Sequence, residues 1–223
     1  MKSKSGKDKD PRKLPLSRRS FLKGAALTSA GAVAAVATLG HLAHADAAPP
    51  ALAEGIAEQL GPGPVDIELK LNGATHRLAV EPRVTLVRAL REHLGMTGTK
   101  LVCDRGSCGA CTVHLDGQPV TSCMMLAVDA RGHEITTIEG LGNPDRMHPV
   151  QDAFVHTDAM QCGFCTPGMV MSIAAALEQN PAADLAAIRQ SVAGNICRCG
   201  TYPHVFAAAL KVARTNGGAK GSA

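Results

Sequence analysis

Aromatic side chains are nearly absent from this chain of 223 residues, which has no Trp, one Tyr and four Phe. Proteins that bind single-stranded nucleic acid without sequence preference use aromatic platforms on which the bases stack, so this composition argues against that class. Large rings, which often dominate the energetics of a core, cannot fill this interior. Another feature of the sequence must therefore organise the fold.

The main body of the chain also lacks an excess of positive charge. Residues 1–24 hold nine Lys and Arg against two Asp, a net charge of +7. Residues 25–223 hold 14 Lys and Arg against 17 Asp and Glu, a net charge of −3. The overall charge of +4 thus comes from the N-terminus, and no basic patch predicts a nucleic-acid partner.

The N-terminus has the organisation of an export signal. The basic residues 1–24 precede an uncharged stretch rich in Ala and Gly over 25–42, and small residues at 43–45 offer a cleavage site. Because Ala and Gly gain little from transfer into hydrocarbon, we expect a cleaved leader and no stable membrane span. Ser-Arg-Arg-Ser-Phe-Leu-Lys at 17–23 resembles the signal read by the twin-arginine translocation machinery, which exports folded, cofactor-loaded proteins. We therefore assign 1–45 as a twin-arginine signal peptide and expect a periplasmic protein.

Composition and periodicity divide the rest of the chain into further segments. Ala, Pro and Gly without a sustained period indicate a linker, and later the pattern changes from strand-like alternation to helical periodicity. These segments are a linker over 46–64, a β-rich domain over 65–140, a helical domain over 145–213 and a flexible tail over 214–223.

The expected elements give an α+β fold, with a small β-grasp domain followed by an all-helical domain. Period-two alternation around Asn72-Gly73 predicts a β-hairpin over 65–80, and Thr85 is a candidate N-cap for the helix that follows. Asp116-Gly117 predicts a second hairpin turn. Helical periodicity recurs over 150–155, 168–177, 185–192 and 206–212.

Eight cysteines fall into two sets of four. An even number of cysteines in an exported chain suggests a disulfide framework, but the spacing argues against it. Four cysteines with C-x4-C-x2-C spacing and one more beyond are typical of plant-type 2Fe-2S ferredoxins. In such a loop, Gly106 and Gly109 let the backbone approach the cluster and donate N–H groups to sulfur. The first set is Cys103, Cys108, Cys111 and Cys123.

The second set consists of two close pairs at helix ends. A C-x2-C pair combined with a C-x-C pair leaves both tetrahedral zinc and a second 2Fe-2S cluster open, because both accept four thiolates. Thioredoxin-like chemistry does not fit, since no βαβ pattern surrounds the motif. The second set is Cys162, Cys165, Cys197 and Cys199.

Several ordered motifs together resemble the two-cluster iron–sulfur subunit of the molybdenum hydroxylases, the xanthine dehydrogenase family. The resemblance covers about 65–213, and within the family the chain is most similar to the small subunits of periplasmic aldehyde oxidoreductases. Where many members read Cys-Arg-Cys-Thr-Gly-Tyr, this chain has Gly200-Thr201 before Tyr202. The motifs are Gly98-Thr99-Lys100, Cys108-Gly109-Ala110-Cys111-Thr112-Val113, Thr137-Ile138-Glu139-Gly140-Leu141, His148-Pro149-Val150-Gln151, Gln161-Cys162-Gly163-Phe164-Cys165-Thr166-Pro167-Gly168-Met169 and Gly194-Asn195-Ile196-Cys197-Arg198-Cys199.

The resemblance implies cofactors and partners that spacing alone does not. It makes both cysteine sets 2Fe-2S sites, the second in a four-helix domain, and implies that Gln161 contacts a molybdenum-pterin. It further implies a large partner subunit with molybdenum-pterin cytosine dinucleotide and a medium partner subunit with FAD. The chain would then pass electrons singly from molybdenum towards FAD or another acceptor, with no substrate-transforming site of its own.

Three alternatives to this function remain. The same role in an N-heterocycle (isoquinoline-like) oxidoreductase would leave this chain unchanged, because the substrate pocket belongs to another subunit. A stand-alone ferredoxin-like carrier would hold clusters without obligate partners. A secreted disulfide-bonded module would hold no iron.

Overall fold

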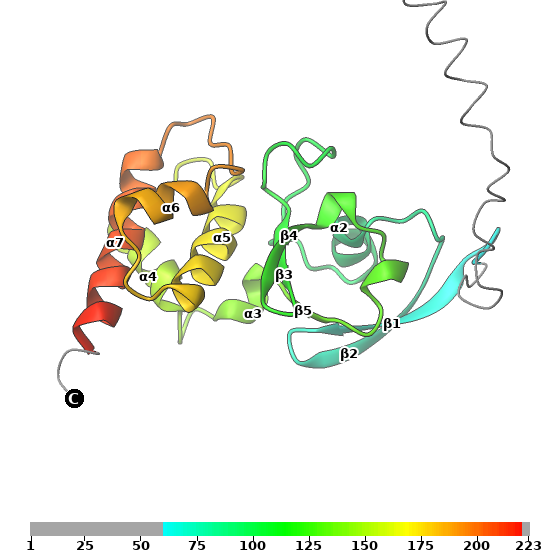
Figure 1. Ribbon diagram of the computed structural model, residues 1–223. Helices are drawn as coiled ribbons and strands as arrows, with labels where there is room; N and C mark the ends of the chain where they lie inside the picture. Colours follow the sequence, from blue (N-terminus) through cyan, green and yellow to red (C-terminus); the bar gives the residue numbers. More distant parts are fainter. Residues whose placement is uncertain (1–59, 220–223) are drawn as a thin grey trace, which may run out of the picture. The chain divides into compact units, whose positions relative to one another are not determined.

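The computed structural model describes residues 60–219 of the chain (Figure 1). The leader predicted over 1–45, with its twin-arginine motif, and residues 46–59 of the linker lie outside the described residues. Residues 60–219 belong to one compact unit. We call residues 60–136 the β-lobe and residues 137–219 the helical lobe, because each has a hydrophobic core of its own.

The β-lobe is built on a mixed five-stranded sheet with the order β2-β1-β5-β3-β4. Ile135 in the central β5 lies opposite Leu71 of β1 in parallel register and opposite Leu115 of β3 in antiparallel register. The hairpins predicted at Asn72-Gly73 and Asp116-Gly117 are confirmed. The strands are β1 (Val65–Leu71), β2 (Ala74–Val80), β3 (Thr112–Leu115), β4 (Gln118–Thr121) and β5 (Glu134–Thr136).

A short helix packs on this sheet, as expected, and Thr85 is its N-cap residue, but the side-chain capping bond is missing. The helix begins as α2 (Leu86–Arg88) and continues as a π-helical turn, Ala89–His93. Thr85 occupies the N-cap position without a side-chain capping bond, and its Oγ1 is buried without a partner. The reason is that the backbone of Thr85 is held in an isolated bridge to Leu126, which directs the side chain inward.

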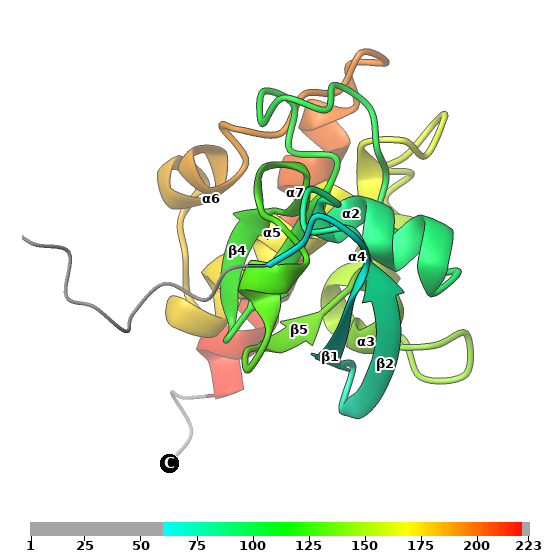
Figure 2. The same cartoon turned by 90° about the vertical axis from the view of Figure 1, so that its right-hand side faces the viewer.

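The helical lobe contains the four helices that the periodicity predicts, preceded by one short helix. Helix α5 (Thr166–Gln179) has the most buried side chains, and it contacts β3 and β4 of the β-lobe as well as the other helices. In Figure 2, which looks from the side of the β-lobe, α5 lies behind β4. The α+β fold class is therefore confirmed. The helices are α3 (Ile138–Leu141), α4 (Pro149–His156), α5 (Thr166–Gln179), α6 (Leu185–Ser191) and α7 (Tyr202–Ala219).

The last helix is longer than the sequence predicts. We expected a flexible tail over 214–223, but α7 continues through Ala219. Val212 and Ala213 are buried against the helical core, and this packing carries the helix beyond the predicted end. The expectation of a tail is therefore wrong for 214–219, and 220–223 lie outside the described residues.

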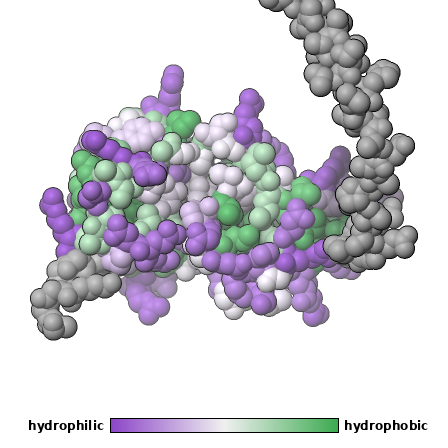
Figure 3. Space-filling view, in the orientation of Figure 1, coloured by the Kyte–Doolittle hydropathy of each residue, from purple (hydrophilic) through white to green (hydrophobic). Residues whose placement is uncertain are grey.

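Polar and apolar side chains are interspersed on the face of the molecule shown in Figure 3. Among the helices of residues 60–219, none combines the length and hydropathy needed to cross a lipid bilayer.

Candidate metal centres

The first set of cysteines gathers at one end of the β-lobe sheet. Cys103 and Cys108 lie in the long loop before β3 and are partly exposed, whereas Cys111 and Cys123 are buried. The β3–β4 hairpin brings the buried cysteines together, because they flank its two open ends. Ser122, beside Cys123, donates from both its backbone N–H and its Oγ to the carbonyl of Cys111, at 3.3 and 2.6 Å.

Backbone N–H groups point at the sulfur atoms of this loop, as expected for an iron–sulfur site. The N–H of Gly106 donates to Cys123 Sγ at 3.3 Å, and the φ of +71° at Gly106 is one that glycine adopts without strain. The prediction for Gly106 is thus confirmed. Gly109 differs: no hydrogen bond from its N–H to sulfur is observed, and its carbonyl accepts bonds instead.

The second set of cysteines is positioned by helix ends in the helical lobe. Cys162 and Cys165 lie directly before α5, and Cys165 is its N-cap residue. Cys197 and Cys199 lie in the loop between α6 and α7. Cys162 and Cys199 are exposed, whereas Cys165 and Cys197 are buried, so this set also combines a buried pair with a more accessible pair.

The thiols of each set lie close enough to influence one another's ionisation. The nearest neighbours are Cys103 and Cys108, Cys111 and Cys123, Cys165 and Cys197, and Cys162 and Cys199. A tetrahedral zinc ion and a 2Fe-2S cluster both take four thiolates, so four neighbouring thiols suit either. Two pairs of thiols per site fit a group with two irons, each of which takes two thiolates.

Each site combines a thiol that ionises readily with one that does not. Backbone N–H groups, first that of Arg105, lower the pKa of Cys103 to about 7. Burial raises the pKa of Cys111 to about 12 and that of Cys165 to about 12. Although burial opposes ionisation of Cys197, hydrogen bonds from Thr201 lower its pKa to about 7. Loading iron must therefore displace protons from the buried thiols, because the thiolate is the ligand.

All eight cysteines are free thiols. A disulfide-bonded module is therefore not what the structure shows. The paired free thiols, the N–H groups aimed at sulfur and the burial of one pair in each site fit two 2Fe-2S clusters.

Comparison with known proteins leads to the same cofactors. A 2Fe-2S iron-sulfur cluster binding domain family matches residues 69–135, and a 2Fe-2S binding domain family matches residues 137–210. The aldehyde oxidoreductase iron-sulfur-binding subunit PaoA of Escherichia coli O157:H7 is 43% identical over 89% of this chain and 89% of its own length. The chain belongs to the two-cluster iron–sulfur subunits of the xanthine dehydrogenase family.

Further relatives show the range of this family. The 6-hydroxypseudooxynicotine dehydrogenase complex subunit beta of Paenarthrobacter nicotinovorans is 41% identical, covering 65% of this chain and 91% of that subunit. Quinoline 2-oxidoreductase from Pseudomonas putida 86 matches with a TM-score of 0.67 and 40% identity, over 72% of this chain and 99% of that chain. Aldehyde oxidoreductase from Desulfovibrio gigas matches with a TM-score of 0.65 and 37% identity, over 69% of this chain but 17% of that chain. By name, the Escherichia coli and Paenarthrobacter relatives are subunits of oxidoreductases, an aldehyde oxidoreductase and a dehydrogenase complex.

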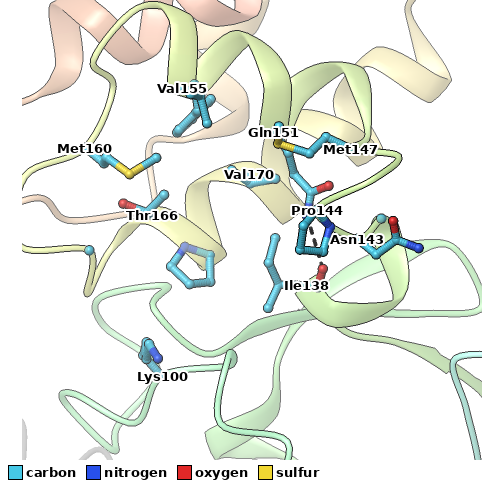
Figure 4. A pocket seen from close by; sticks show the side chains of 14 residues that line it. Lys100, Ile138, Asn143, Pro144, Met147, Gln151, Val155, Met160, Thr166 and Val170 are labelled. Atoms are coloured by element: carbon cyan, nitrogen blue, oxygen red, sulfur yellow. Dashed lines mark hydrogen bonds between the residues drawn. The ribbon is translucent and has the colours of Figure 1, made fainter.

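In this iron–sulfur subunit, an apolar groove lies beside the second cysteine loop. It has a volume of about 580 Å³. Figure 4 shows Met147, Gln151 and Val155 on one side of the groove and Lys100, from the β-lobe, on the other. The Nε2 of Gln151 donates to the carbonyl of Ile138 at 3.3 Å and so links α4 to α3 in the wall of the groove. Gln161, which the resemblance assigns to a pterin contact, is exposed next to this groove.

Sequence reasoning missed the polar residues that connect the two cysteine loops of the iron–sulfur subunit. The Tyr202 hydroxyl accepts from the N–H of Cys197 at 2.9 Å and donates to the carbonyl of Asn195 at 3.0 Å. The Asn195 side chain in turn donates to Gly109 in the other lobe. Asn195 and Tyr202 lie close to Cys197 in the sequence, which could have marked them as candidates. The sequence does not show, however, which groups their side chains contact.

Proposed function

We propose that this chain is the electron-transfer subunit of a molybdenum-containing aldehyde oxidoreductase that operates in the periplasm. The observation that carries this proposal is the extent of the likeness to the Escherichia coli aldehyde oxidoreductase subunit, which covers 89% of this chain. Since 60–223 are only 164 of the 223 residues, that likeness must extend into 1–59. The relatives from nicotine and caffeine oxidising enzymes match over about 150 residues and about two thirds of this chain.

The partners we propose are a large subunit with molybdenum-pterin cytosine dinucleotide and a medium subunit with FAD. The second centre suits docking to the large subunit, because Cys162 and Cys199 are exposed there. Large apolar side chains beside these thiols are also exposed: Phe164 by 58% and Ile196 by 55%. Such side chains next to a groove are typical of a protein–protein contact. Gln161, exposed in the same loop, would contact the pterin of that subunit.

The chain's own residues hold the clusters and shape the path between them. When bound, each 2Fe-2S group accepts and releases one electron at a time. The eight thiolates would hold the two groups, and the Gly106 N–H bond to Cys123 Sγ favours negative charge on sulfur. Because Cys111 and Cys165 are buried, these two ligands are shielded from water. Oxidation of the substrate would take place on the large subunit.

Substrate class is tested with the assembled complex. After anaerobic purification with its partner subunits, an aromatic aldehyde is expected to bleach the visible iron–sulfur absorbance of this chain within seconds, whereas isoquinoline is expected not to. Similarity to quinoline 2-oxidoreductase over 99% of that chain makes N-heterocycle oxidation the second candidate. Bleaching by isoquinoline but not by aldehydes would establish that candidate instead. Elution of the native protein as a single chain would favour a stand-alone carrier.

Export by the twin-arginine machinery is part of the same proposal. Replacing both Arg18 and Arg19 by Lys is expected to leave the protein in the cytoplasm at its full-length mass, because the paired guanidinium groups are the recognised feature of the signal. The wild-type protein is expected in the periplasm without residues 1–45. Cell fractionation and intact-mass measurement distinguish the two. Arg12→Lys, outside the motif, is the matched control, and equal export of the double variant would refute the proposal.

A further inference from the structure

The two cysteine loops approach each other across the boundary between the lobes. The backbone N–H of Ile196 donates to the carbonyl of Cys108 at 3.0 Å. Cys108 is a thiol of the first site, and Ile196 directly precedes Cys197, a thiol of the second. One hydrogen bond and a few covalent bonds therefore connect a ligand of one site to a ligand of the other.

Asn195 holds this contact in place from the side. The residue is only 5% exposed, and its side chain bonds to both lobes. Its Nδ2 donates to the carbonyl of Gly109 in the first loop at 3.0 Å, and its Oδ1 accepts from Ser172 Oγ of α5 at 2.9 Å. Its own carbonyl accepts from the Tyr202 hydroxyl. Asn195 thus joins the first cysteine loop, α5 and the start of α7 at one point.

The backbones at this point are close enough to leave no room for adjustment. Gly109 has a φ of +65°, and a Cβ there would lie 2.5 Å from Nδ2 of Asn195 and 2.7 Å from the carbonyl oxygen of Gly194. The Gly109 carbonyl also accepts from Thr112 Oγ1 at 2.7 Å. The Gly109 carbonyl therefore accepts one hydrogen bond from its own loop and one from Asn195. Because of this second bond, we expect a change at residue 195 to move the first loop relative to the second.

We propose that Asn195 is the positioning residue that sets the spacing of the two iron–sulfur centres and keeps the Ile196–Cys108 hydrogen bond as the electron crossing between them. An electron that crosses there oxidises one cluster by one unit and reduces the other by one unit, with no bond or proton transferred. The inference rests on the two cluster sites and deepens the proposed electron-transfer function. The direction of electron flow depends on the partner subunits and not on Asn195.

The test measures how strongly the two clusters interact in the full chain. In Asn195→Ala, both hydrogen bonds of the side chain are lost, so the loops are expected to separate. Iron and sulfide content is expected to stay at the wild-type level. The magnetic splitting between the two clusters, measured by low-temperature EPR after full reduction with dithionite, is expected to be lost or much reduced. One-electron equilibration between the clusters after flash photoreduction is expected to be several times slower.

Two further variants keep the test decisive. Asn180→Ala, at the exposed C-cap of α5, is the matched control and should retain both wild-type values. Ser172→Ala removes only the bond to Oδ1 and is expected to shift both readouts less, in the same direction. If the Asn195→Ala variant does not load both clusters, the magnetic splitting and the equilibration rate of the Ser172→Ala variant test the inference instead. Wild-type splitting and wild-type equilibration in a fully loaded variant would overturn the inference.

The outcome is independent of the proposed substrate. Splitting and equilibration are measured with a chemical or photochemical reductant, without the partner subunits or an aldehyde. If aldehydes fail to bleach the complex while Asn195→Ala still loses the splitting, the proposed function fails and the positioning role stands. If aldehydes bleach the complex while Asn195→Ala keeps the wild-type splitting and equilibration, the positioning role fails and the proposed function stands.

Discussion

Cys103→Ala is expected to remove the cluster of the β-lobe and to leave the cluster of the helical lobe. Cys103 is one of two partly exposed thiols of its site, and alanine supplies no ligand in its place. The helical lobe has its own core and all four of its own thiols, so its site does not depend on Cys103 for ligands. Iron and sulfide per chain should fall to half, and one of two EPR signals should disappear.

The reciprocal variant is the control for this result. Cys162→Ala is expected to remove the other EPR signal and to halve the iron in the same way. Loss of both clusters from either variant would contradict the idea that each lobe assembles its cluster separately. It would show that loading of one site depends on the other.

Gly168→Ala is expected to destabilise the protein strongly. Gly168 lies in the first turn of α5, and a Cβ there would overlap the carbonyl oxygen of Gly109 and lie 3.0 Å from its carbonyl carbon and 3.1 Å from Ala110 Cα. These neighbours are backbone atoms of the first cysteine loop, so they cannot rotate away. Overpacking of this kind lowers the free energy of unfolding by about 3 kcal/mol. Thermal unfolding, followed by loss of iron–sulfur absorbance, should show a clearly lower midpoint.

A second glycine provides the comparison. Gly194→Ala adds the same methyl group a short distance away, where no atom lies within 4 Å of the new Cβ. Its midpoint is expected to match the wild type. If Gly168→Ala also unfolds at the wild-type temperature, the close approach of α5 to the first loop does not contribute to stability as the packing indicates.

Most secondary structure followed from local patterns. The hairpin turn at Asn72-Gly73 was predictable because both residues must adopt positive φ, which Asn and Gly do most easily. The helices after residue 148 were predictable from apolar spacing. Differences arose where tertiary contacts compete with local preference, as at Thr85, which is the N-cap residue but forms no capping bond while its backbone bridges to Leu126.

The candidate site was predictable to the extent that its chemistry is encoded in spacing. C-x4-C-x2-C describes a loop whose ligands are near neighbours in sequence, so the first site was readable directly. The second site left zinc open, because spacing within each pair does not say how the pairs meet. Asn195 bonds to Gly109 across 86 residues of sequence, and no local pattern reports such a contact.

The sequence by itself thus determined that this chain has eight thiols in two sets, a β-grasp lobe before a helical lobe, and an N-terminus built like an export signal. These properties depend on residue type and short-range spacing, which physical chemistry relates directly to turns, helices and metal preference. The tertiary structure decided which thiols lie beside one another, which pair in each site is less buried, and that hydrogen bonds from Ile196 and Asn195 join the two loops. Those properties depend on how α5 and the loop around Asn195 pack against the first lobe, and packing joins residues far apart in the chain.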